Sequence, residues 1–317
     1  MEITVTVNPS VDRLYELKQL KVGQLNRVQL IKKMVGGKGI NAARVSANLG
    51  AKTVATGFLA GSNGKYILEQ AKNDQYKCNF IETNGNTRNC YTIIQNNGEK
   101  TEINEYGDHI PLQYFNQLLE TIEQLITKNK VAAISLNGSL PPSEIHNFYP
   151  QIIAKVRDLN PDIKIVLDTS GKALAEVLNS DNLPDFIKPN ETEVAELLAF
   201  PVTKDYSILR KEILTSKLIK IPNIIVSLGE KGALFKHEHD FYSIKLKPVK
   251  VVNTEGSGDS LVGGLLYALG KNYDFKEAIK WAIASGTANA METKTGFVEL
   301  SKVLEIIKTI KIERIAD

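Results

Sequence analysis

An α/β fold is predicted for this chain, with a mostly parallel central sheet, helices on both of its faces and a small separate β-sheet. Short apolar runs alternate with segments of helical periodicity along most of the 317 residues, and this alternation is typical of strand–helix–strand units in a parallel sheet. After Gly258 the pattern becomes mainly helical. Two regions, 11–34 and 88–105, break the alternation and have the pattern of hairpins, so they are expected to pair into the small sheet.

Six apolar runs of strand length are expected to form the buried central sheet. They are ITVTV (3–7), TVATGF (53–58), VAAISL (131–136), IKIVLD (163–168), DFIKPN (185–190) and NIIVSLG (223–229). The segments between them repeat apolar residues at spacings of three and four, as helices do: ARVSANLG (43–50), YILEQAKND (66–74), YFNQLLETIEQLITKN (114–129), IHNFYPQIIAKVRDL (145–159) and ETEVAELLAF (191–200). Helical segments are also expected in LVGGLLYALG (261–270), FKEAIKWAIASGTANAME (275–292) and LSKVLEIIKTIKIE (300–313).

The two hairpin regions suggest a cover for a cleft. Asn97-Gly98 is a strong turn signal within the second region. No linker rich in proline or serine and no internal repeat divides the chain. We therefore expect a single domain over residues 1–317, with a lid formed by about 11–34 and 88–105.

The composition is that of a globular protein, with 43% hydrophobic and 24% charged residues. The net charge of +3, from 39 basic and 36 acidic residues, is too balanced to make nucleic acid or a membrane surface an expected partner. No run of 18 apolar residues occurs, the first residues lack the pattern of a signal peptide, and two cysteines cannot form a disulfide framework. A cytoplasmic location is expected.

An aspartate stands at the start of a long apolar segment in VVNTEGSGDSLVGGLLYALG (251–270). A Gly-Ser-Gly turn ahead of a helix offers backbone N–H groups to an anion, and its glycines let phosphate oxygens approach. An acid at this place is suited to take a proton from a hydroxyl that attacks the phosphate. From the residues alone, the competing interpretation is that Asp259 only complements the helix dipole.

A second glycine cluster, VGGKGINAARVSANLG (35–50), contains GKGINA, which matches the dinucleotide fingerprint G-x-G-x-x-A. The run before it belongs to the expected lid, and no acid occurs between Ala42 and Glu69 to bind a ribose. In the alternative interpretation, the glycines admit a polyhydroxy ligand, with Lys38 and Asn41 as donors. A plain helix start would need at most one glycine and no lysine.

Three shorter motifs follow expected strands. NPSVD (8–12) lies at the strand end where ligands gather in open α/β sheets, although Asp12 also suits an Asx-turn. In KPNETEVAEL (188–197), Asn190 and Glu193 would share a helix face and either organise a hydrated Mg²⁺ or form a capping box. SLGEKGAL (227–234) offers a glycine turn for a nucleotide. No P-loop or protein-kinase motif set occurs, and the four histidines lack zinc-ligand spacing.

In their order along the chain, NPSVD, GGKGIN, SLGEKG and GSGDS together resemble the motifs of the PfkB, or ribokinase-like, carbohydrate kinases. The resemblance covers nearly the whole chain. It is closest to the branch of 1-phosphofructokinases and tagatose-6-phosphate kinases, through NPSVDRLYEL, VGGKGINAARV, GNTRNC, NGSLPP, VLDTSGKAL, IKPNETE and GSGDS. It implies a ribokinase-like fold, ATP and Mg²⁺ as cofactors, a monovalent cation such as K⁺ near the nucleotide loop, and a homodimer formed through the lids.

The resemblance also implies a role for each matching residue. Asp259 would be the catalytic base, beside an anion hole formed by Gly256, Ser257 and Gly258. The sugar and its phosphate would be held by Asp12, Gly36, Gly37, Lys38, Asn41, Arg88, Asn137 and, from the lid, Arg27. Nucleotide contacts would fall at Lys188, Asn190, Ser227, Gly229, Gly232, Gly256 and Gly258. Glu193, together with Asn190, would assist the Mg²⁺ shell through water.

Three residues depart from the usual pattern of that family. Ser257 replaces alanine in its G-A-G-D turn, Glu255 stands where a small or apolar residue is commoner, and Asn137 stands where serine is usual. Glu255 adds negative charge near the nucleotide, and Asn137 alters a polar contact near the sugar. These departures bear on the substrate rather than on the class of reaction.

The expected activity is therefore the ATP-dependent phosphorylation of a ketohexose monophosphate. Fructose 1-phosphate, at its 6-hydroxyl, is the first choice because DRLYEL and the lid pattern look more like 1-phosphofructokinases. Tagatose 6-phosphate is the alternative, because GNTRNC and VSLGEKGALFKH look equally like tagatose-6-phosphate kinases, and fructose 6-phosphate comes third. Two other classes, a non-catalytic sugar-phosphate sensor and a dinucleotide oxidoreductase, are opposed by the intact Asp259 motif and by the missing ribose acid.

Overall fold

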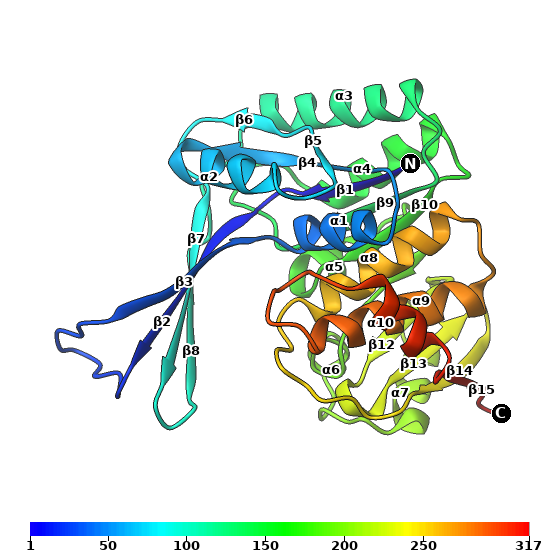
Figure 1. The fold of residues 1–317 in the computed structure, drawn as a ribbon. Helices are drawn as coiled ribbons and strands as arrows, with labels where there is room; N and C mark the ends of the chain where they lie inside the picture. The colour runs from blue at the N-terminus through cyan, green and yellow to red at the C-terminus, as the bar shows by residue number, and fades with distance from the viewer. Residues whose placement is uncertain (317) are drawn as a thin grey trace.

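The central sheet has eleven strands in this computed structural model, which describes residues 1–316 (Figure 1). The strand order is β15-β14-β13-β12-β11-β10-β9-β1-β4-β5, with β6 pairing with β4. The strands are β1 (Glu2–Thr6), β4 (Thr53–Ala60), β5 (Lys77–Cys78), β6 (Ile81–Thr83), β9 (Ala133–Asn137), β10 (Lys164–Asp168), β11 (Phe186–Ile187), β12 (Asn223–Ser227), β13 (Ala233–His237), β14 (Asp240–Lys245) and β15 (Lys311–Arg314). Pairing is parallel from β12 to β5 and antiparallel through β13, β14 and β15. All six expected runs form strands of the parallel part.

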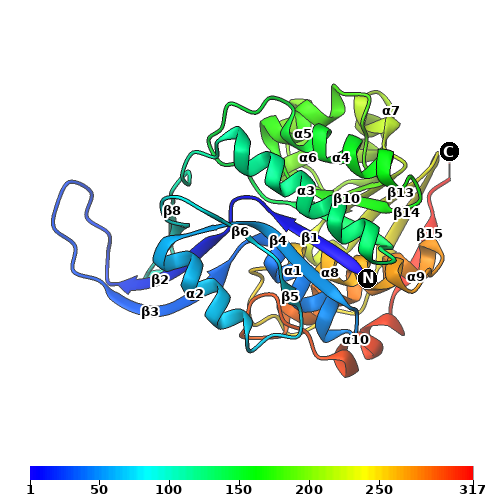
Figure 2. The ribbon, with the colours of Figure 1, turned by 90° about the horizontal axis from the view of Figure 1, so that it is seen from above.

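Helices cover both faces of this sheet (Figure 2). One layer consists of α1 (Lys38–Asn48), α8 (Ser257–Gly270), α9 (Phe275–Ala290) and α10 (Leu300–Ile307); the other consists of α3 (Leu112–Lys128), α4 (Phe148–Leu159), α5 (Gly171–Leu178), α6 (Glu191–Leu198) and α7 (Tyr206–Leu214). Successive residues of a strand point to opposite faces of the sheet and so pack against different helix layers. On β10, Ile165 and Leu167 pack into the core of the α3–α7 side, whereas Val166 packs into the core of the α8–α10 side.

A separate four-stranded sheet, the small sheet, extends from the body (Figure 1). Its order is β3 (Gln29–Gly36), β2 (Ser10–Leu17), β7 (Arg88–Gln95) and β8 (Lys100–Asn104). The two hairpin regions of the sequence therefore form one sheet, in which β2 and β7 pair in parallel. Gly98 has a φ of +86° in the turn before β8, a conformation that glycine adopts readily. Helix α2 (Gly61–Ala71) packs near the base of β2 and β3.

The structure differs from the expected elements in a few places. β11 has two residues instead of six, because Pro189 has no N–H to donate to a strand and Asn190 already caps α6. Helix α1 begins at Lys38, before its apolar periodicity starts. Helices α5 and α7 were not among the expected elements. The helix expected over 300–313 ends at Ile307, and Lys311–Arg314 form strand β15 instead. Among residues 1–316, no helix combines the length and the apolar character needed to cross a membrane.

Candidate active site

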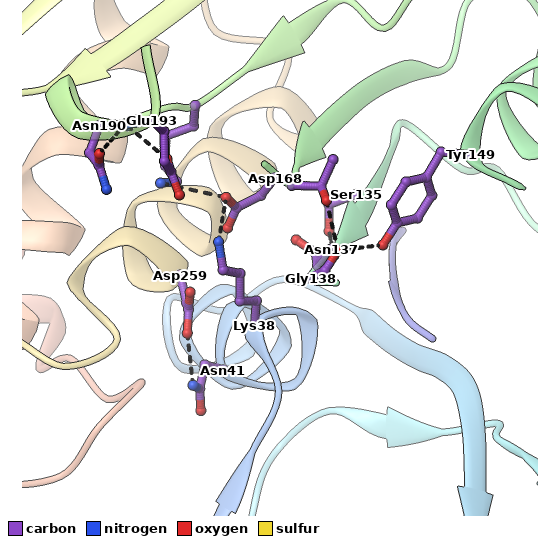
Figure 3. A network of polar contacts seen from close by, with 12 residues as sticks. Lys38, Asn41, Ser135, Asn137, Gly138, Tyr149, Asp168, Asn190, Glu193 and Asp259 are labelled. Carbon is purple, nitrogen blue, oxygen red and sulfur yellow. Dashed lines mark hydrogen bonds and ion pairs between the residues drawn. The ribbon is translucent and has the colours of Figure 1, made fainter. Parts of the chain in front are cut away.

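The candidate residues gather where the carboxyl ends of β10 and β11 meet the N-termini of α1, α6 and α8 (Figure 3). In an open α/β sheet, this is the edge at which ligands bind. The side chains of Lys38, Asn41, Asp168 and Asp259 point toward one another there, and Asn190 and Glu193 lie beside them. Segments separated by more than 200 residues in the sequence thus share one site.

Asp259 lies in the first turn of α8, behind a turn that requires glycine at position 256. Gly256, the N-cap, has a φ of +73°, and an added Cβ would lie 2.5 Å from Thr295 Cγ2. A Cβ at Gly258 would lie 3.0 Å from Lys188 Nζ. Because the first N–H groups of a helix have no partner within it, this turn can bind a phosphate next to a lysine.

The hydrogen bonding and the pKa of the Asp259 carboxyl group suit a general base. Its Oδ2 accepts a hydrogen bond of 2.8 Å from Asn41 Nδ2. Burial and then the negative charge of Asp168 raise the pKa of Asp259 to about 6, although Lys38 opposes this shift. A carboxylate with this pKa is ionised at neutral pH and still takes up a proton readily.

Asp168, the last residue of β10, joins two lysines from different elements. Its Oδ1 lies 3.2 Å from Lys38 Nζ and 3.5 Å from Lys188 Nζ, while its side chain is only 2% exposed. The pKa of Asp168 is lowered by Lys188 and Lys38, although burial alone would raise it; the pKa of Lys38 is raised chiefly by Asp168. Asp168 thus holds two lysine side chains together, and one of them, Lys188, lies beside the turn at the start of α8.

Sequence reasoning gave Asp168 no role. The signal was present, since a carboxylate that directly follows the apolar run IKIVL lies at the carboxyl end of a parallel strand. One of its oxygens, Oδ2, is buried without a hydrogen-bond partner in the described structure. Such an atom is costly unless a ligand or an ion completes its surroundings.

At the base of the small sheet, the carboxylate of Asp12 on β2 lies close to Gly36 on β3, whose partner across the strands is Ser10. Ser10 Oγ donates to Asp12 Oδ1 at 2.6 Å, and an added Cβ at Gly36 would lie 2.2 Å from that same oxygen. Burial is the main cause that raises the pKa of Asp12. Gly37, with a φ of +123°, then leads the chain into α1. The glycines thus leave room for the Asp12 carboxylate at the base of the small sheet.

Two of the expected sugar ligands, Arg88 and Arg27, lie in very different surroundings. Arg88 begins β7, where Nε donates to Asn8 O at 3.3 Å and Nη1 to Glu105 O at 3.0 Å, so the side chain is fixed at the base of the small sheet. Arg27 lies exposed in the loop between β2 and β3, which projects away from the body (Figure 2). The structure does not bring Arg27 to the other candidates.

Asn137 also departs from expectation, because it is 0% exposed. Its Nδ2 donates to Val5 O and Ser135 Oγ, and an added Cβ at Gly39 would lie 2.8 Å from that nitrogen. This burial does not fit a direct contact with a sugar. Asn137 instead packs against Gly39 in the first turn of α1.

Asn190 and Glu193 form the capping box of α6. Glu193 N donates to Asn190 Oδ1 at 2.8 Å, and Asn190 N donates to Glu193 Oε2 at 2.9 Å. The helix-capping interpretation is therefore correct, and it leaves Glu193 Oε1 for other partners. Residues 1–316 contain no group of three or more His, Cys, Asp or Glu side chains placed to hold a metal ion.

The nucleotide-loop candidates adjoin this capping box. Ser227, at the end of β12, pairs with Asn190 through an isolated parallel bridge. Gly229 and Gly232 have φ values of +59° and +87° in the turn that follows. An added Cβ at Gly232 would lie 1.9 Å from Ile244 O, so close packing on β14 alone explains that glycine.

Two further residues near the α8 turn were missed from the sequence. Asn289, fully buried on α9, donates to Glu255 O and Ser257 Oγ and accepts from Gly296 N, so it holds the turn against the 295–297 segment. Lys100 of β8 lies 2.6 Å from Glu255 Oε1. The unusual charge of Glu255 is thus balanced by the small sheet, which also explains why an acid is tolerated there.

A buried carboxylate at a glycine-bounded helix N-terminus and two adjacent lysines, on a mostly parallel α/β sheet with a small second sheet, are the features expected of a phosphotransferase of the sugar kinase class. Comparison with known proteins agrees. The model of the pfkB family of carbohydrate kinases matches residues 5–301. The chain therefore belongs to the pfkB family of carbohydrate kinases, which are phosphotransferases that act on a hydroxyl group.

Individual relatives match over nearly their full length. Tagatose-6-phosphate kinase from Staphylococcus epidermidis is 39% identical over 312 residues, which is 98% of this chain and 99% of the relative. A Staphylococcus aureus protein provisionally described as a phosphofructokinase is 31% identical, with a TM-score of 0.76 and 99% of each chain covered. Phosphofructokinase-2 from Escherichia coli, in a structure with potassium, is 25% identical, with a TM-score of 0.82, covering 96% of this chain and 97% of that one.

Proposed function

We propose that the protein transfers the terminal phosphoryl group of ATP to a hydroxyl of a ketohexose monophosphate, with Asp259 as the general base. The observation that carries this proposal is the Asp259 carboxylate, held by Asn41 at the N-terminus of α8. Its pKa of about 6 keeps it ionised at neutral pH, so that it can accept the proton of the attacking hydroxyl. The turn at Gly256–Gly258 would hold the transferred phosphoryl group.

The remaining charges fit the substrates of such a reaction. Lys38 and Lys188 supply positive charge that Asp168 holds in place before substrate binds, and phosphoryl transfer depends on positioned positive charge. Mg²⁺ supplies charge neutralisation between ATP phosphates. Glu193 fits an indirect role, since Oε1 of its carboxylate is left over by the capping box and Mg²⁺ usually keeps several waters. We include a monovalent cation because the E. coli relative was crystallised with potassium.

Two ketohexose phosphates are the leading candidates for the acceptor, ahead of fructose 6-phosphate. The sequence pattern of the N-terminal third favours fructose 1-phosphate, and the 39% identical relative from S. epidermidis favours tagatose 6-phosphate. Each carries one phosphate and one primary hydroxyl, at opposite ends of a six-carbon chain. The same base and lysines serve either acceptor, so the contacts around Asp12 and Arg88 would decide between them.

The test is ADP release with fructose 1-phosphate, tagatose 6-phosphate and fructose 6-phosphate under matched conditions. The sugars are ranked by kcat/KM, with Mg²⁺ omitted or K⁺ replaced by tetramethylammonium in parallel reactions. A lead of either of the first two sugars, with a requirement for Mg²⁺, supports the proposal and names the acceptor. ATP binding without ADP release for all three would contradict kinase activity on these sugars.

Arg88→Ala is expected to raise the KM for the sugar phosphate about tenfold or more while the KM for ATP stays within about twofold. The guanidinium lies at the base of the small sheet and can bind a phosphate bidentately. Arg13→Ala is the matched control, since Arg13 lies on the adjacent strand and bonds Asn89. An equal rise of both KM values in Arg88→Ala would show that Arg88 supports the fold rather than the substrate.

The small sheet is proposed to act as a lid and as the dimer interface. Large apolar side chains are exposed on the sheet (Leu30, Ile31 and Ile103) and on the loop between β2 and β3 (Val22 and Leu25), and exposed apolar patches mark association sites. An E. coli relative, 26% identical with a TM-score of 0.83, has a tetrameric form, which supports assembly of this chain. Sedimentation equilibrium of the wild type and of Ile103→Glu tests the interface; a monomeric wild type would refute it.

A further inference from the structure

Arg44 is a buried charge that the proposed function leaves without a role. It lies on α1, three residues after Asn41, and is 5% exposed. Its Nη1 donates to Asn41 Oδ1 at 2.9 Å, and Asn41 Nδ2 donates to Asp259 Oδ2 at 2.8 Å. Arg44 is therefore separated from the proposed base by a single side chain.

The bond from Arg44 decides which end of the Asn41 amide faces Asp259. A carboxamide has one donor end and one acceptor end, whereas a guanidinium has only donors. With its oxygen on Arg44, the amide presents its NH₂ group to the carboxylate. The reversed amide would place its oxygen against a carboxylate oxygen and its NH₂ group against the guanidinium, and both contacts would repel.

Arg44 is itself held in a dense set of contacts. Its Nε donates to Asp74 Oδ2 at 2.8 Å, with the two side chains only 6% and 7% exposed, and Nη1 also donates to Thr295 O at 3.3 Å. Lys294 Nζ lies 3.5 Å from the other oxygen of Asp74. Tyr76 lies near enough for the Arg44 charge to oppose the rise that burial causes in the pKa of Tyr76. A buried ion pair gains little net stability over apolar packing. Stability alone therefore does not account for the Arg44–Asp74 pair, whereas the orientation of the Asn41 amide does.

Asn41 is also confined on its other side. An added Cβ at Gly296 would lie 2.7 Å from both Asn41 Cβ and Asn41 Oδ1, so the backbone of the 295–296 segment packs directly on the amide. Asn289 holds that segment through Gly296 N at 2.8 Å. The Asn41 amide therefore has little room to rotate, and the guanidinium fixes its direction.

We propose that Arg44, held by Asp74, is a positioning residue that fixes the amide of Asn41 and, through it, the catalytic carboxylate of Asp259. The inference rests on the proposed function, because it requires Asp259 to be the base. The Asn41 bond leaves Asp259 Oδ1 as the oxygen that receives the proton. It also favours the ionised carboxylate, so its loss raises the pKa of Asp259 further.

The hydrogen-bonded chain from Arg44 through Asn41 to Asp259 is called the relay below. Other charged residues lie beside its two ends, and the variants used in the test do not replace them. Asp168, Lys38 and Lys188 act on Asp259. Asp74, Tyr76 and Lys294 surround Arg44. Arg44→Ala also removes the counterion of Asp74, whereas Asn41→Ala leaves that pair intact. A shift of the acid limb that both variants share therefore reports on the Asn41 bond.

The test compares Arg44→Ala, Asn41→Ala and the double variant by their kcat/KM profiles from pH 5 to pH 9. Arg44→Ala is expected to lower kcat about 10- to 100-fold, a loss typical of a misplaced reacting group. The acid limb of its profile moves to higher pH, and the KM for ATP stays within about twofold. Asn41→Ala moves the acid limb in the same direction, and the double variant moves it no further, as two residues of one relay require.

Two additional measurements separate positioning from folding. Arg44 and Asp74 line a cavity of about 320 Å³, which is large enough for a guanidinium ion, so millimolar guanidinium is expected to restore part of the activity of Arg44→Ala but none to Asn41→Ala. Arg44→Lys, which keeps one donor and the charge, is expected to be intermediate. Arg157→Ala is the control, because Arg157 of α4 pairs with Asp185 at 2.7 Å just before the start of β11, whereas the site lies at the carboxyl ends of the strands; it loses stability without a shifted profile.

An Arg44→Ala variant with the kcat and pH profile of Arg157→Ala would overturn the inference. So would an additional shift in the double variant, or activity lost in Arg44→Ala and Arg44→Lys in proportion to lost stability, without guanidinium rescue. The failure of the underlying function looks different. If Asp259→Asn keeps its turnover, the base is misassigned; if Asp259→Asn is inactive and Arg44→Ala is normal, only the relay is refuted.

Discussion

Asp259→Asn is expected to lower kcat by about 10²- to 10⁴-fold, the range in which a general base contributes, while the affinity for ATP changes little. The amide keeps the shape of the side chain and can still contact Asn41, but it cannot accept the hydroxyl proton at neutral pH. Steady-state kinetics and equilibrium binding of ATP check the two halves of this expectation. Asp162→Asn, a change of the same kind at an exposed position, serves as the control and should be neutral.

The wild-type pH profile belongs to the same expectation. Because the base must be ionised and the pKa of Asp259 is about 6, kcat/KM should fall tenfold per pH unit below about pH 6. It should be level between about pH 7 and pH 8. A profile without an acid limb near pH 6, together with Asp259→Asn turnover within tenfold of the wild type, would remove Asp259 from the catalytic role.

Asp168→Ala is expected to destabilise the fold by about 3 kcal/mol at neutral pH, because it leaves the buried Lys188 and the half-buried Lys38 without their shared counterion. The pKa of Asp168 is lowered in the folded state. Its contribution to stability is therefore present above the unfolded pKa and is lost as the pH falls through the folded one. Urea unfolding at pH 7 and at pH 3 should show a larger difference between variant and wild type at pH 7.

A second readout connects this carboxylate to the substrate. In Asp168→Ala, inorganic phosphate can take the place of the missing charge, so it should raise the unfolding temperature of the variant more than that of the wild type. Asp240→Ala, which breaks an exposed pair with Arg314, should cost less than about 1 kcal/mol and show no such phosphate effect. Equal unfolding free energies for Asp168→Ala and Asp240→Ala would show that the lysines do not depend on Asp168.

The parallel strands and most helices could be predicted because period-2 and period-3.6 patterns are local properties of the sequence. The short β11 could not, since its end is decided by competition between Pro189 and the cap of α6. Side-chain partners that are distant in the sequence could not be predicted either. Neither the joining of Lys38 and Lys188 by Asp168 nor the pairing of Glu255 with Lys100 leaves a trace at the level of spacing.

The surroundings of two expected sugar ligands were equally beyond a local pattern. Asn137 was assigned by its motif and Arg27 by its place in the lid, and the fold buries the first and carries the second out along the small sheet. Gly36 and Gly256 behaved differently. Their lack of a side chain is needed for close approaches that the structure shows, and such steric demands are what a glycine motif in a sequence encodes.

The division of the cleft between chain segments has a consequence for how such a protein changes over time. The groups at Asp12, Gly36 and Arg88 come from the N-terminal third, whereas the α8 turn and the residues 188–193 come from the C-terminal half. Mutations among the N-terminal residues can change which sugar is bound without disturbing phosphoryl transfer at the α8 turn. A laboratory selection for a new acceptor should therefore accumulate its changes in residues 8–36 and 86–108, and a graft of that region between relatives should carry sugar preference with it.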